Sequence, residues 1–595
     1  METYENLVDM FERSTKKYAS RPALRRKKTG GAYQWLTYAE IAKQVDEFRG
    51  GLASLGVTPG DRVAIIADNG PAWAVAAYAT YGLGGQYVPM YEAQLPKEWE
   101  YILRDSGTKV LLVANDKIEE KTKSFLGHVP TLQHIVNLSR VSDDATTFAG
   151  LRKIGREKPV PSIKPDAQDV CGFIYTSGTT GNPKGVLLTH ENICSNVNAV
   201  HEVFPMSSED VSLSFLPWAH SFGQTVELHC MLSYGASMGL AESVSKIIDN
   251  LAEVKPTLLF SVPRIFNRIY DGVNKKMAED GGLKKKLFDR LMKLATEKKK
   301  LAAEGKSLGF FSQMQLNLLD KVVASKVRAR FGGRLKYAFS GGAALSKDVA
   351  DFIDNLNITV YEGYGLTETS PIATANWPDN RKIGSVGKPI PRVKVSLEPA
   401  EGAPEGQGEI VVHGPNIMKG YHNLPEEDAK VFTADRGFRT GDMGRIDADG
   451  FVFITGRVKE QYKLENGKYV APAPLEEKLR LSPYIANLMV DGTNRPYNIA
   501  VIVADVDALK KWAAANNVAA GDVDKLLSDP AVTKLIKADI EKFGAEFKGF
   551  ERPEKFILTH EDFTTDNGML TPSLKVKRRV VMAKYGEQIA KLYQS

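Results

Sequence analysis

The chain has 595 residues, of which 43% are hydrophobic and 25% are charged, a composition typical of a globular protein with several domains. Its formal net charge of +6 is small for this length, and the sequence has no zinc, basic-zipper or aromatic RNA-binding pattern, so nucleic acid is not expected as a partner. Three scattered cysteines, Cys171, Cys194 and Cys230, are typical of reduced thiols and not of a disulfide framework or a metal site.

The N-terminal segment is charged and amphipathic, and it lacks the apolar core and cleavage site of a secretory signal. No run approaches the roughly 18 apolar residues that a membrane span needs. We therefore expect a cytoplasmic protein that does not cross a bilayer.

In the first third of the chain, strand-like apolar runs alternate with helix-like segments. Arg62 to Ala67 and Val110 to Ala114 are expected to be strands, and Thr37 to Leu55 is expected to be a helix. Such alternation is typical of parallel α/β layers, so the expected fold class is α/β.

The most informative segment runs from Tyr175 to Val186 and reads YTSGTTGNPKGV. Its glycines permit positive φ, its hydroxyls and amides can face phosphate oxygens, and its lysine supplies a positive charge. The candidate phosphate-binding residues are Thr176, Ser177, Gly178, Thr179, Thr180, Gly181 and Lys184. A Walker loop would have Gly before the lysine and Ser or Thr after it, but here Pro183 and Gly185 flank Lys184. The loop predicts nucleotide binding, but not an ordinary P-loop ATPase.

Further motifs follow in order along the chain. They are LPWAH at 216–220, SGGA at 340–343, YEGYGLTET at 361–369, RTGD at 439–442, GRVK at 456–459 and LTPSLKVKRR at 570–579. Together with the loop, these motifs resemble the adenylate-forming (AMP-binding) superfamily, which includes acyl-CoA synthetases, luciferases and the adenylation domains of peptide synthetases. The resemblance covers essentially the whole chain.

The resemblance implies a large N-terminal body of doubly wound α/β subdomains plus a small β-barrel, and a small mobile α+β lid domain at the C-terminus. A polar Gly/Pro stretch at 398–408 between two strand-like runs fits a hairpin or a small barrel. The implied boundaries are 1–455 for the body, 456–460 for a hinge containing Lys459, and 461–595 for the lid.

The chemistry of the family accounts for these residue types. A carboxylate is a poor acyl donor, so its oxygen first attacks the α-phosphate of ATP, which releases pyrophosphate and gives an acyl-AMP. The charge that develops on the phosphates requires preorganised cations and donors. The resemblance therefore implies that the hydroxyls of the loop and Lys184 hold the β- and γ-phosphates.

The YEGYGLTET motif matches the part of the family that holds the metal and the adenosine. Glu368, together with Thr176, matches the magnesium-binding position, since hard oxygen donors suit this ion, and Thr367 would contact the α-phosphate. The implied adenine-binding residues are Tyr364, Gly365, Gly341, Gly342 and Ala343. A solvated glutamate in a turn is the competing interpretation of Glu368, and core packing is that of Tyr364.

Three further positions match family residues. Asp442 would accept hydrogen bonds from both ribose hydroxyls with the help of Arg457, whereas a surface salt bridge is the alternative for this pair. His220 occupies the place of an aromatic or imidazole group between the carboxylate site and the second-substrate tunnel. A structural buried histidine is the alternative for His220.

Lys575 matches the catalytic lysine of the family's GKILRR pattern, which contacts the carboxylate and α-phosphate oxygens. The chain departs from that pattern because Leu574 replaces the expected glycine, and a shift of register to Lys577 stays open. Gly467 matches the glycine that leaves a channel for the pantetheine arm of coenzyme A after the lid rotates. A plain turn is an equally good interpretation of Gly467.

The region between the hinge and Gly467 resembles the long-chain acyl-CoA synthetase branch and lacks the large insertion of fatty acyl-AMP ligases. Ser261 to Arg268 is similar to the segment that lies beside the acyl tunnel in long-chain members, and Trp218 and Phe222 are candidates to line that tunnel or to pack in the core. The lysine-rich helical stretch 270–330 is compatible with a solvated helix or with contact to anionic lipid headgroups. Acidic residues are interleaved in it, and no strong apolar face is expected.

The sequence thus predicts a ligase that uses ATP and Mg²⁺ to activate a long- or medium-chain fatty acid and transfers the acyl group to coenzyme A. The alternatives are an aryl or other carboxylic acid:CoA ligase, a fatty acyl-AMP ligase, or an inactive homologue that only binds nucleotide or fatty acid. The oligomeric state, monomer or homodimer, stays open.

Overall fold

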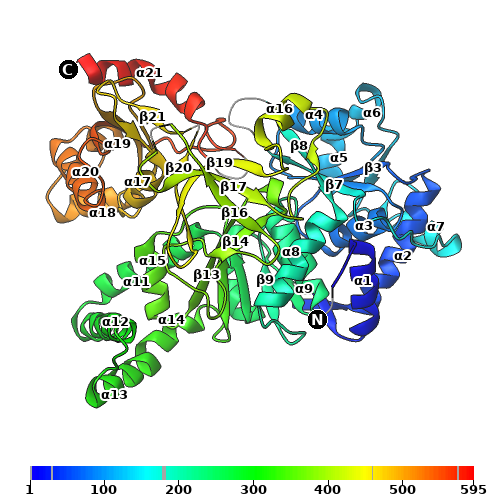
Figure 1. Cartoon of the computed structure of the whole chain (residues 1–595), viewed down its shortest axis with the longest axis horizontal. Coiled ribbons are helices and arrows are strands. Elements are labelled where there is room, and N and C mark those ends of the chain that lie inside the picture. Colours follow the sequence, from blue (N-terminus) through cyan, green and yellow to red (C-terminus); the bar gives the residue numbers. More distant parts are fainter. Residues whose placement is uncertain are drawn as a thin grey trace. The chain divides into compact units, whose positions relative to one another are not determined.

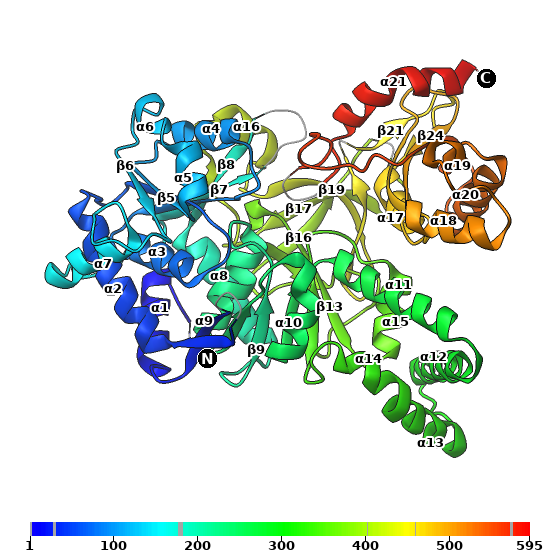
Figure 2. The same ribbon diagram turned by 180° about the vertical axis from the view of Figure 1, so that it is seen from behind.

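The computed structural model describes residues 3–27, 31–176, 182–401, 403–458, 460–571 and 575–594 (Figures 1 and 2). The chain forms two compact units. The first contains Met1–Thr176, Asn182–Val395 and Val412–Phe438, and the second contains Ser396–Val411 and Arg439–Ser595. The division by packing thus lies upstream of the hinge expected at 456–460, which stays a prediction.

One large sheet of the first unit has seven strands in the order β18-β8-β7-β4-β3-β5-β6. They are β18 (Gly420–Tyr421), β8 (Lys184–Thr189), β7 (Val170–Thr176), β4 (Gln86–Met90), β3 (Arg62–Ile66), β5 (Val110–Val113) and β6 (His134–Asn137). The strands from β7 to β6 pair in parallel, whereas β8 and β18 add antiparallel pairs at one edge. All of β5 is buried, as expected for a parallel strand with both faces covered.

The helices that accompany this sheet begin where the sequence supplies caps. Thr37 and Glu40 form a capping box at the start of α2, which confirms the helix expected from 37 to 55, and the strands expected near 62 and 110 are β3 and β5. The helices are α2 (Tyr38–Ser54), α3 (Pro71–Tyr81), α4 (Pro96–Ser106), α5 (Asp116–Thr122), α6 (Phe125–His128), α7 (Phe148–Glu157) and α8 (His190–Val203).

The second large sheet of this unit has nine strands in the order β15-β14-β13-β12-β11-β9-β10-β1-β2. They are β15 (Lys388–Pro389), β14 (Ile372–Ala375), β13 (Thr359–Gly365), β12 (Tyr337–Ser340), β11 (Leu258–Ser261), β9 (Val211–Ser214), β10 (Ser237–Leu240), β1 (Pro22–Lys27) and β2 (Tyr33–Thr37). From β13 to β1 the neighbouring strands are parallel. Two mostly parallel sheets therefore make up the body, in agreement with the expected α/β class.

The remaining helical elements of the first unit follow or precede strands of the nine-stranded sheet, except α16, which follows β18 of the seven-stranded sheet. They are α1 (Leu7–Lys17), the π-helix η1 (Phe222–His229), α9 (Cys230–Ser233), η2 (Val244–Lys246), α10 (Ile247–Val254), α11 (Pro263–Asp280), α12 (Gly282–Ala303), α13 (Phe310–Leu319), η3 (Asp320–Ala324), α14 (Ser325–Ala329), α15 (Lys347–Asn355), η4 (Thr367–Thr369) and α16 (Pro425–Val431). The helical stretch expected from 270 to 330 is thus present as α11 to α14.

The second unit begins with a four-stranded sheet, β16-β17-β19-β20. Its strands are β16 (Lys394–Glu398), β17 (Gln407–His413), β19 (Phe438–Ile446) and β20 (Val452–Arg457). The first two are neighbours, so the hairpin expected around the polar stretch 398–408 is confirmed.

The C-terminal part of this unit has a three-stranded sheet between two layers of helices. Its elements are β21 (Tyr462–Lys463), β22 (Tyr469–Val470), α17 (Pro472–Leu479), β23 (Ile485–Asp491), β24 (Asn498–Ala504), α18 (Val506–Ala515), α19 (Val523–Leu527), α20 (Pro530–Phe543), β25 (Pro553–Thr559) and α21 (Arg578–Gln594). Residues 500 and 502 of the central strand β24 pack against α17 to α20, and residues 499, 501 and 503 pack against α21. This alternation confirms an α+β C-terminal domain.

None of the helices in these described ranges has an apolar run long enough to span a bilayer. The three cysteines are all buried and free.

Candidate functional site

The phosphate-loop region begins and ends on an antiparallel strand pair. Thr176 is the last residue of β7 and pairs with Lys184, the first residue of β8. The intervening candidates lie outside the described residues: Ser177, Gly178, Thr179, Thr180 and Gly181. The pairing of β7 with β8 therefore places Thr176, with its hydroxyl group, directly opposite Lys184, with its ammonium group.

The ammonium group of Lys184 pairs with a carboxylate that the sequence analysis did not identify. Its Nζ donates to Glu427 on α16, and Lys430 Nζ donates to the other carboxylate oxygen at 2.5 Å. Hydrogen bonds from Lys184 and then Lys430 lower the pKa of Glu427 to about 2, so this carboxylate is ionised at neutral pH. Lys184 is thus paired with an ionised carboxylate of the same unit.

Tyr421 links Lys184 to the predicted metal ligand. It lies on β18, which pairs with β8, and its ring centroid is 5.1 Å from Lys184 Nζ. Its hydroxyl donates to Glu368 Oε1 at 2.8 Å. Burial raises the pKa of Tyr421, so the phenol stays protonated and remains a donor. The side chain of Glu368 is therefore not a freely solvated glutamate in a turn.

The next contact leads from the YEGYGLTET motif to the LPWAH motif. Thr367, beside Glu368 in η4, is buried, and its Oγ1 is 3.3 Å from Ser221 Oγ. His220 precedes this serine, and its Nδ1 accepts the backbone N–H of Phe222 at 3.2 Å. The half-buried His220 therefore accepts a backbone hydrogen bond at the start of η1. Its position between the carboxylate site and the second-substrate tunnel stays a prediction.

The same helix also reaches the SGGA motif. A Cβ atom at Gly341 would lie 3.2 Å from the ring of Phe222, so a larger residue there would push against this ring. Gly342 and Ala343 continue the turn that follows β12. The pairing of Phe222 with Gly341 favours a packing role for this ring, and Trp218 is fully buried against Trp73 with ring centroids 5.6 Å apart.

Tyr364 and Gly365 end β13, where the chain turns into η4. A Cβ atom at Gly365 would lie 1.7 Å from the carbonyl oxygen of Pro371, a distance that no side chain tolerates. Only glycine allows this close approach, which fixes the path of the chain that carries Glu368.

Thus contacts within the first unit join four motifs that are far apart in the sequence. The phosphate-loop strands, YEGYGLTET, LPWAH and SGGA meet through Tyr421, Ser221 and Phe222. The convergence of these four motifs is a property of the fold, because the contacts that join them are between residues far apart in the sequence.

In the second unit, Asp442 and Arg457 face each other on β19 and β20. Arg457 Nε donates to Asp442 Oδ1 at 2.7 Å, and the aspartate is buried. Because the Asp442 carboxylate is buried, the pair is not an ordinary surface ion pair. The arrangement holds the acceptor oxygens of Asp442 in a defined orientation.

Lys575 precedes α21 and is exposed. Its backbone N–H donates to Thr571 Oγ1 at 3.0 Å, and its backbone carbonyl accepts the N–H of Thr571. The neighbouring Arg578 has a different role, because it donates to both oxygens of the buried Glu476 at 2.7 Å. Within this basic run, Arg578 is therefore held by an ion pair with a buried carboxylate, whereas Lys575 is exposed before the helix.

Gly467 lies in the turn between β21 and β22 with φ +82, and Lys459 of the expected hinge lies outside the described residues. A Cβ atom at Gly467 would contact only Lys463 Cε, at 3.9 Å. The glycine is required here by its backbone conformation and not by crowding.

Sequence reasoning missed Tyr421, Glu427 and the buried Glu227. The segment GYHNLPEED at 420–428 carries the first two, and a carboxylate at the start of a short helix gives no sign of its partner. Glu227 did leave a signal, because it is a charged residue within the otherwise uncharged helical run 221–228.

Glu227 lies inside η1 and is completely buried. Ser212 and Ser214 of β9 donate to its two carboxylate oxygens at 2.9 and 2.6 Å. Burial raises the pKa of Glu227 to about 7, although the hydrogen bonds from Ser214 and Ser212 oppose the shift. The folded protein therefore binds a proton here at a pH where the unfolded chain has lost it.

We expect Glu227→Gln to stabilise the protein at pH 8 relative to wild type, but not at pH 4. The ordinary pKa of glutamate is 4.5, so the folded state is penalised as pH rises from 4.5 to about 7, and the penalty is constant above that range. It amounts to about 3 kcal/mol at most, at roughly 1.4 kcal/mol per pKa unit. Thermal unfolding at several pH values measures it. The exposed Glu426→Gln is the control, and a pH-independent difference for Glu227→Gln would contradict the assignment.

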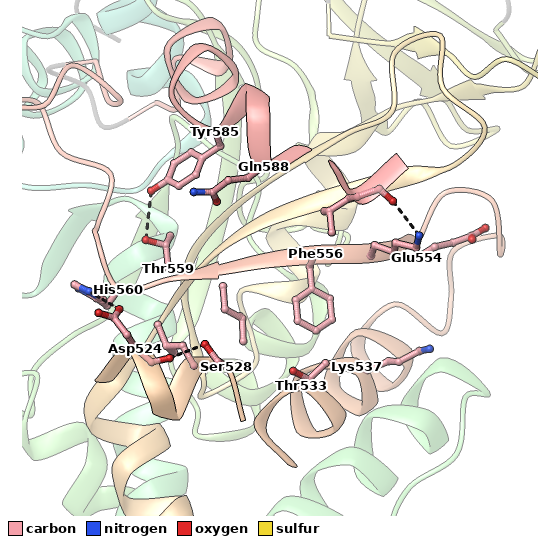
Figure 3. A pocket seen from close by; sticks show the side chains of 14 residues that line it. Asp524, Ser528, Thr533, Lys537, Glu554, Phe556, Thr559, His560, Tyr585 and Gln588 are labelled. Atoms are coloured by element: carbon pink, nitrogen blue, oxygen red, sulfur yellow. Dashed lines mark hydrogen bonds and ion pairs between the residues drawn. The ribbon is translucent and has the colours of Figure 1, made fainter. Parts of the chain in front are cut away.

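A hollow of about 610 Å³ in the second unit lies between β25, α19, α20 and α21 (Figure 3). Tyr585 donates to Thr559 Oγ1 at 3.3 Å, and His560 Nε2 is 3.3 Å from Asp524 across it. None of the predicted site residues lines this hollow. It is separate from the residues to which the sequence assigned chemistry.

Among the described residues, no group of three or more His, Cys, Asp and Glu side chains could hold a metal ion by itself. Magnesium bound through one carboxylate and nucleotide phosphates needs no such group. Glu368 suits this mode, because its carboxylate retains acceptor capacity beyond the one hydrogen bond from Tyr421.

The chain matches two family models. Residues 11–422 match the model described as AMP-binding enzyme, and residues 459–595 match the AMP-binding enzyme C-terminal domain. The chain is 31% identical to long chain acyl-CoA synthetase 7, peroxisomal, of Arabidopsis thaliana, over 99% of this chain and 86% of the relative. It is 33% identical to the long-chain-fatty-acid–CoA ligase FadD15 of Mycobacterium bovis, over 95% of this chain and 93% of that protein.

Solved structures share the fold. The anthranilate CoA ligase AuaEII in complex with anthranoyl-AMP has a TM-score of 0.75 at 22% identity, with 99% of both chains covered. The adenylation domain of a carboxylate reductase from Mycobacterium chelonae has a TM-score of 0.77 at 24% identity, with 99% of this chain and 91% of that chain covered. With family models covering both the N-terminal and C-terminal parts and relatives matched over nearly the full length, the chain belongs to the AMP-binding enzyme family.

Proposed function

We propose that this chain is a fatty acid:CoA ligase that forms AMP. It activates a long- or medium-chain fatty acid with ATP to an acyl-AMP and releases pyrophosphate. It then transfers the acyl group to the thiol of coenzyme A and releases AMP. The relatives named above, which are long-chain acyl-CoA synthetases and ligases, support the fatty acid as the substrate class.

The observation that carries the proposal is the set of contacts around Tyr421. One side chain lies 5.1 Å from the predicted phosphate-binding ammonium of Lys184 and hydrogen-bonds to the predicted metal ligand Glu368. Binding of a magnesium nucleotide requires a cation for the phosphates and a carboxylate for the metal within reach of one ligand. This arrangement supports ATP as the nucleotide.

In the proposed first step, Lys184 exchanges Glu427 for the terminal phosphates, and Thr176 adds a hydroxyl donor. Glu368 would hold Mg²⁺, which when bound neutralises charge on the phosphates. The hydroxyl of Thr367 would donate to the α-phosphate. These groups orient the triphosphate so that the carboxylate oxygen approaches in line with the leaving pyrophosphate.

The second unit would supply the other contacts. Asp442 would accept from the ribose hydroxyls, in an orientation that Arg457 maintains. Lys575 would neutralise the carboxylate and α-phosphate oxygens during acyl-AMP formation. Gly467 would give passage to the pantetheine arm in the thioester step, after movement about the hinge at Lys459.

The test is AMP production by the purified protein with ATP, Mg²⁺ and coenzyme A over a panel of carboxylates. We expect AMP formation with palmitate and decanoate that depends on coenzyme A, and much less with benzoate or anthranilate. A preference for the aryl acids would identify an aryl acid ligase. Pyrophosphate release without thioester formation would identify an acyl-AMP ligase, and no reaction with any acid would identify an inactive homologue.

We expect Glu427→Gln to lower the KM for ATP by about threefold to fivefold, because the ion pair that phosphate must replace is worth up to about 1 kcal/mol. The neutral amide no longer competes with phosphate for Lys184. Steady-state kinetics at saturating acid and coenzyme A measure the effect. Glu426→Gln changes the same charge on the same helix and is expected to leave KM unchanged. A higher KM in Glu427→Gln would show that Glu427 positions Lys184 for phosphate.

Replacing Gly467 with phenylalanine is expected to spare ATP–pyrophosphate exchange and to slow thioester formation at least about tenfold. The positive φ adds a strain of about 1 kcal/mol for any side chain, so the phenylalanine variant needs a matched control. Gly467→Asn is that control, because asparagine adopts this conformation more readily and is smaller. Equal loss of thioester formation in both variants, or loss of exchange, would assign Gly467 to the turn alone.

A cytoplasmic location is proposed for the catalytic reaction. The three cysteines, which are all buried and free, support it, because reduced thiols are typical of a reducing compartment. Cell fractionation that recovers the protein with periplasmic or secreted markers would contradict it.

A further inference from the structure

The outer end of the first unit is a helical hairpin made of α12 and the continuous helical run α13-η3-α14. Figures 1 and 2 both show α12 and α13 projecting away from the sheets of this unit. Leu291 and Leu294 of α12 are buried, as are Leu316 and Leu319 of α13, and the two helices pack against each other. The hairpin therefore has its own small apolar core.

The opposite side of the second helical run is also apolar, yet nothing in the described chain covers it. The exposed residues are Phe310 at 77%, Phe311 at 78%, Met314 at 56%, Leu318 at 62% and Val322 at 47%; we call them the outer stripe. Four of them recur every four residues and so lie on one face of the helix. The stripe holds five of the fourteen large hydrophobic residues that are exposed in the described chain. Single exposed apolar residues are ordinary, but a contiguous stripe indicates an interaction surface.

The hairpin is also where the positive charge of the protein is concentrated. The hairpin, residues 282–329, contains twelve Lys and Arg but only four Asp and Glu, a net charge of +8. The whole chain carries only +6, so the rest of the protein is negatively charged. Lys321 and Lys326 are exposed beside the stripe, and Lys326 follows Val322 by one helical turn. An apolar stripe flanked by cations on a helix parallel to a surface suits an anionic lipid interface.

We propose that the outer stripe inserts into the headgroup region of an anionic bilayer, with the lysines of the hairpin against the lipid phosphates. The charge decides against a second copy of the chain as the occupant, since two hairpins of net charge +8 repel each other. The lysine-rich α12 has interleaved acidic residues and would not bind a membrane strongly by itself. The apolar contact with the bilayer comes instead from the outer stripe, which begins on α13. The proposal depends on exposure and charge, and it stands independently of the proposed ligase activity.

The test uses the full-length chain and sedimentation with lipid vesicles. We expect the protein to pellet with vesicles that contain phosphatidylglycerol and not with pure phosphatidylcholine, and the bound fraction to fall with added salt. The double variant Phe310→Ser/Phe311→Ser is expected to bind anionic vesicles at least about tenfold more weakly. Val244→Ser/Ile248→Ser removes two exposed apolar residues elsewhere on the same unit and is expected to bind as wild type does.

Two charge-reversal variants separate the electrostatic contribution to vesicle binding from the apolar contribution of the outer stripe. Lys321→Glu/Lys326→Glu is expected to weaken binding about tenfold, whereas Lys117→Glu/Lys121→Glu on α5 leaves it within about twofold. Equal pelleting with phosphatidylcholine, or no pelleting at all, would overturn the proposal. So would a dimer in light scattering that becomes monomeric when Phe310 and Phe311 are replaced, because the stripe would then be a self-interface.

The same variants keep this proposal distinct from the ligase proposal. AMP production with decanoate in the absence of vesicles is expected to be unchanged in all four double variants, since none of them alters a residue of the predicted site. Vesicle binding without any ligase activity would refute the proposed function and leave the membrane surface intact. Ligase activity without vesicle binding would do the opposite.

Discussion

Lys575→Ala is expected to lower the rate of acyl-AMP formation by about 10²- to 10³-fold. A carboxylate and a triphosphate repel each other, and this exposed cation would offset the charge on the attacking and α-phosphate oxygens. Conversion of supplied acyl-AMP to the thioester is expected to be nearly unchanged, because in the proposed function the lysine would serve only the first step. ATP–pyrophosphate exchange and single-turnover thioester formation measure the two steps separately.

Lys577→Ala is the matched control, and it also tests the register of the motif. Its backbone N–H donates to the carbonyl of Met569, a contact that the substitution preserves. A larger effect of Lys577→Ala would move the catalytic assignment to that residue. Equal loss in both half-reactions of Lys575→Ala would instead assign Lys575 to the stability of the domain.

Glu368→Gln is expected to lower kcat/KM for ATP by about 10²-fold or more and to raise the Mg²⁺ concentration needed for half-maximal activity. The amide is isosteric with the carboxylate and can still accept a hydrogen bond from Tyr421, so the fold around η4 should persist. What it lacks is the negative charge that a hard cation prefers. Pyrophosphate exchange measured over a range of Mg²⁺ concentrations gives the result.

Tyr421→Phe completes the comparison. It removes the hydroxyl that donates to Glu368 and keeps the ring near Lys184. We expect a decrease in kcat/KM of about tenfold, with the Mg²⁺ dependence altered less than in Glu368→Gln. Unchanged Mg²⁺ dependence in Glu368→Gln would show that the carboxylate does not bind the metal, and its hydrogen bond to Tyr421 would then be structural.

The alternation of strands and helices was sufficient to predict the α/β class of the body, and the resemblance carried by the ordered motifs implied the α+β C-terminal domain. Local pattern was reliable for α2, because Thr37 and Glu40 supply its cap within the same short segment. It was also sufficient for the hairpin of β16 and β17, which a polar Gly/Pro stretch separates. Both features depend on residues near each other in the chain.

The sequence interpretation of the lysine-rich stretch was incomplete for a physical reason. It expected no strong apolar face, yet α13 is apolar on two sides, with Leu316 and Leu319 inside and Phe310 and Phe311 outside. Helical periodicity shows which residues share a face, but not which faces a neighbouring helix covers. Only the packing against α12 shows that one apolar face is left exposed.

By itself, the sequence determined which residue types suited to binding nucleotide phosphates are present and their order along the chain, because the glycines, hydroxyls and lysine of the predicted loop lie within twelve consecutive residues. The tertiary structure alone decided the partners of those residues. Glu427 meets Lys184 across 243 positions, and Tyr421 meets Glu368 across 53. Such contacts depend on the pairing of β18 with β8. The residues of the short polar segment 420–428 do not indicate by themselves which strand the segment will pair with.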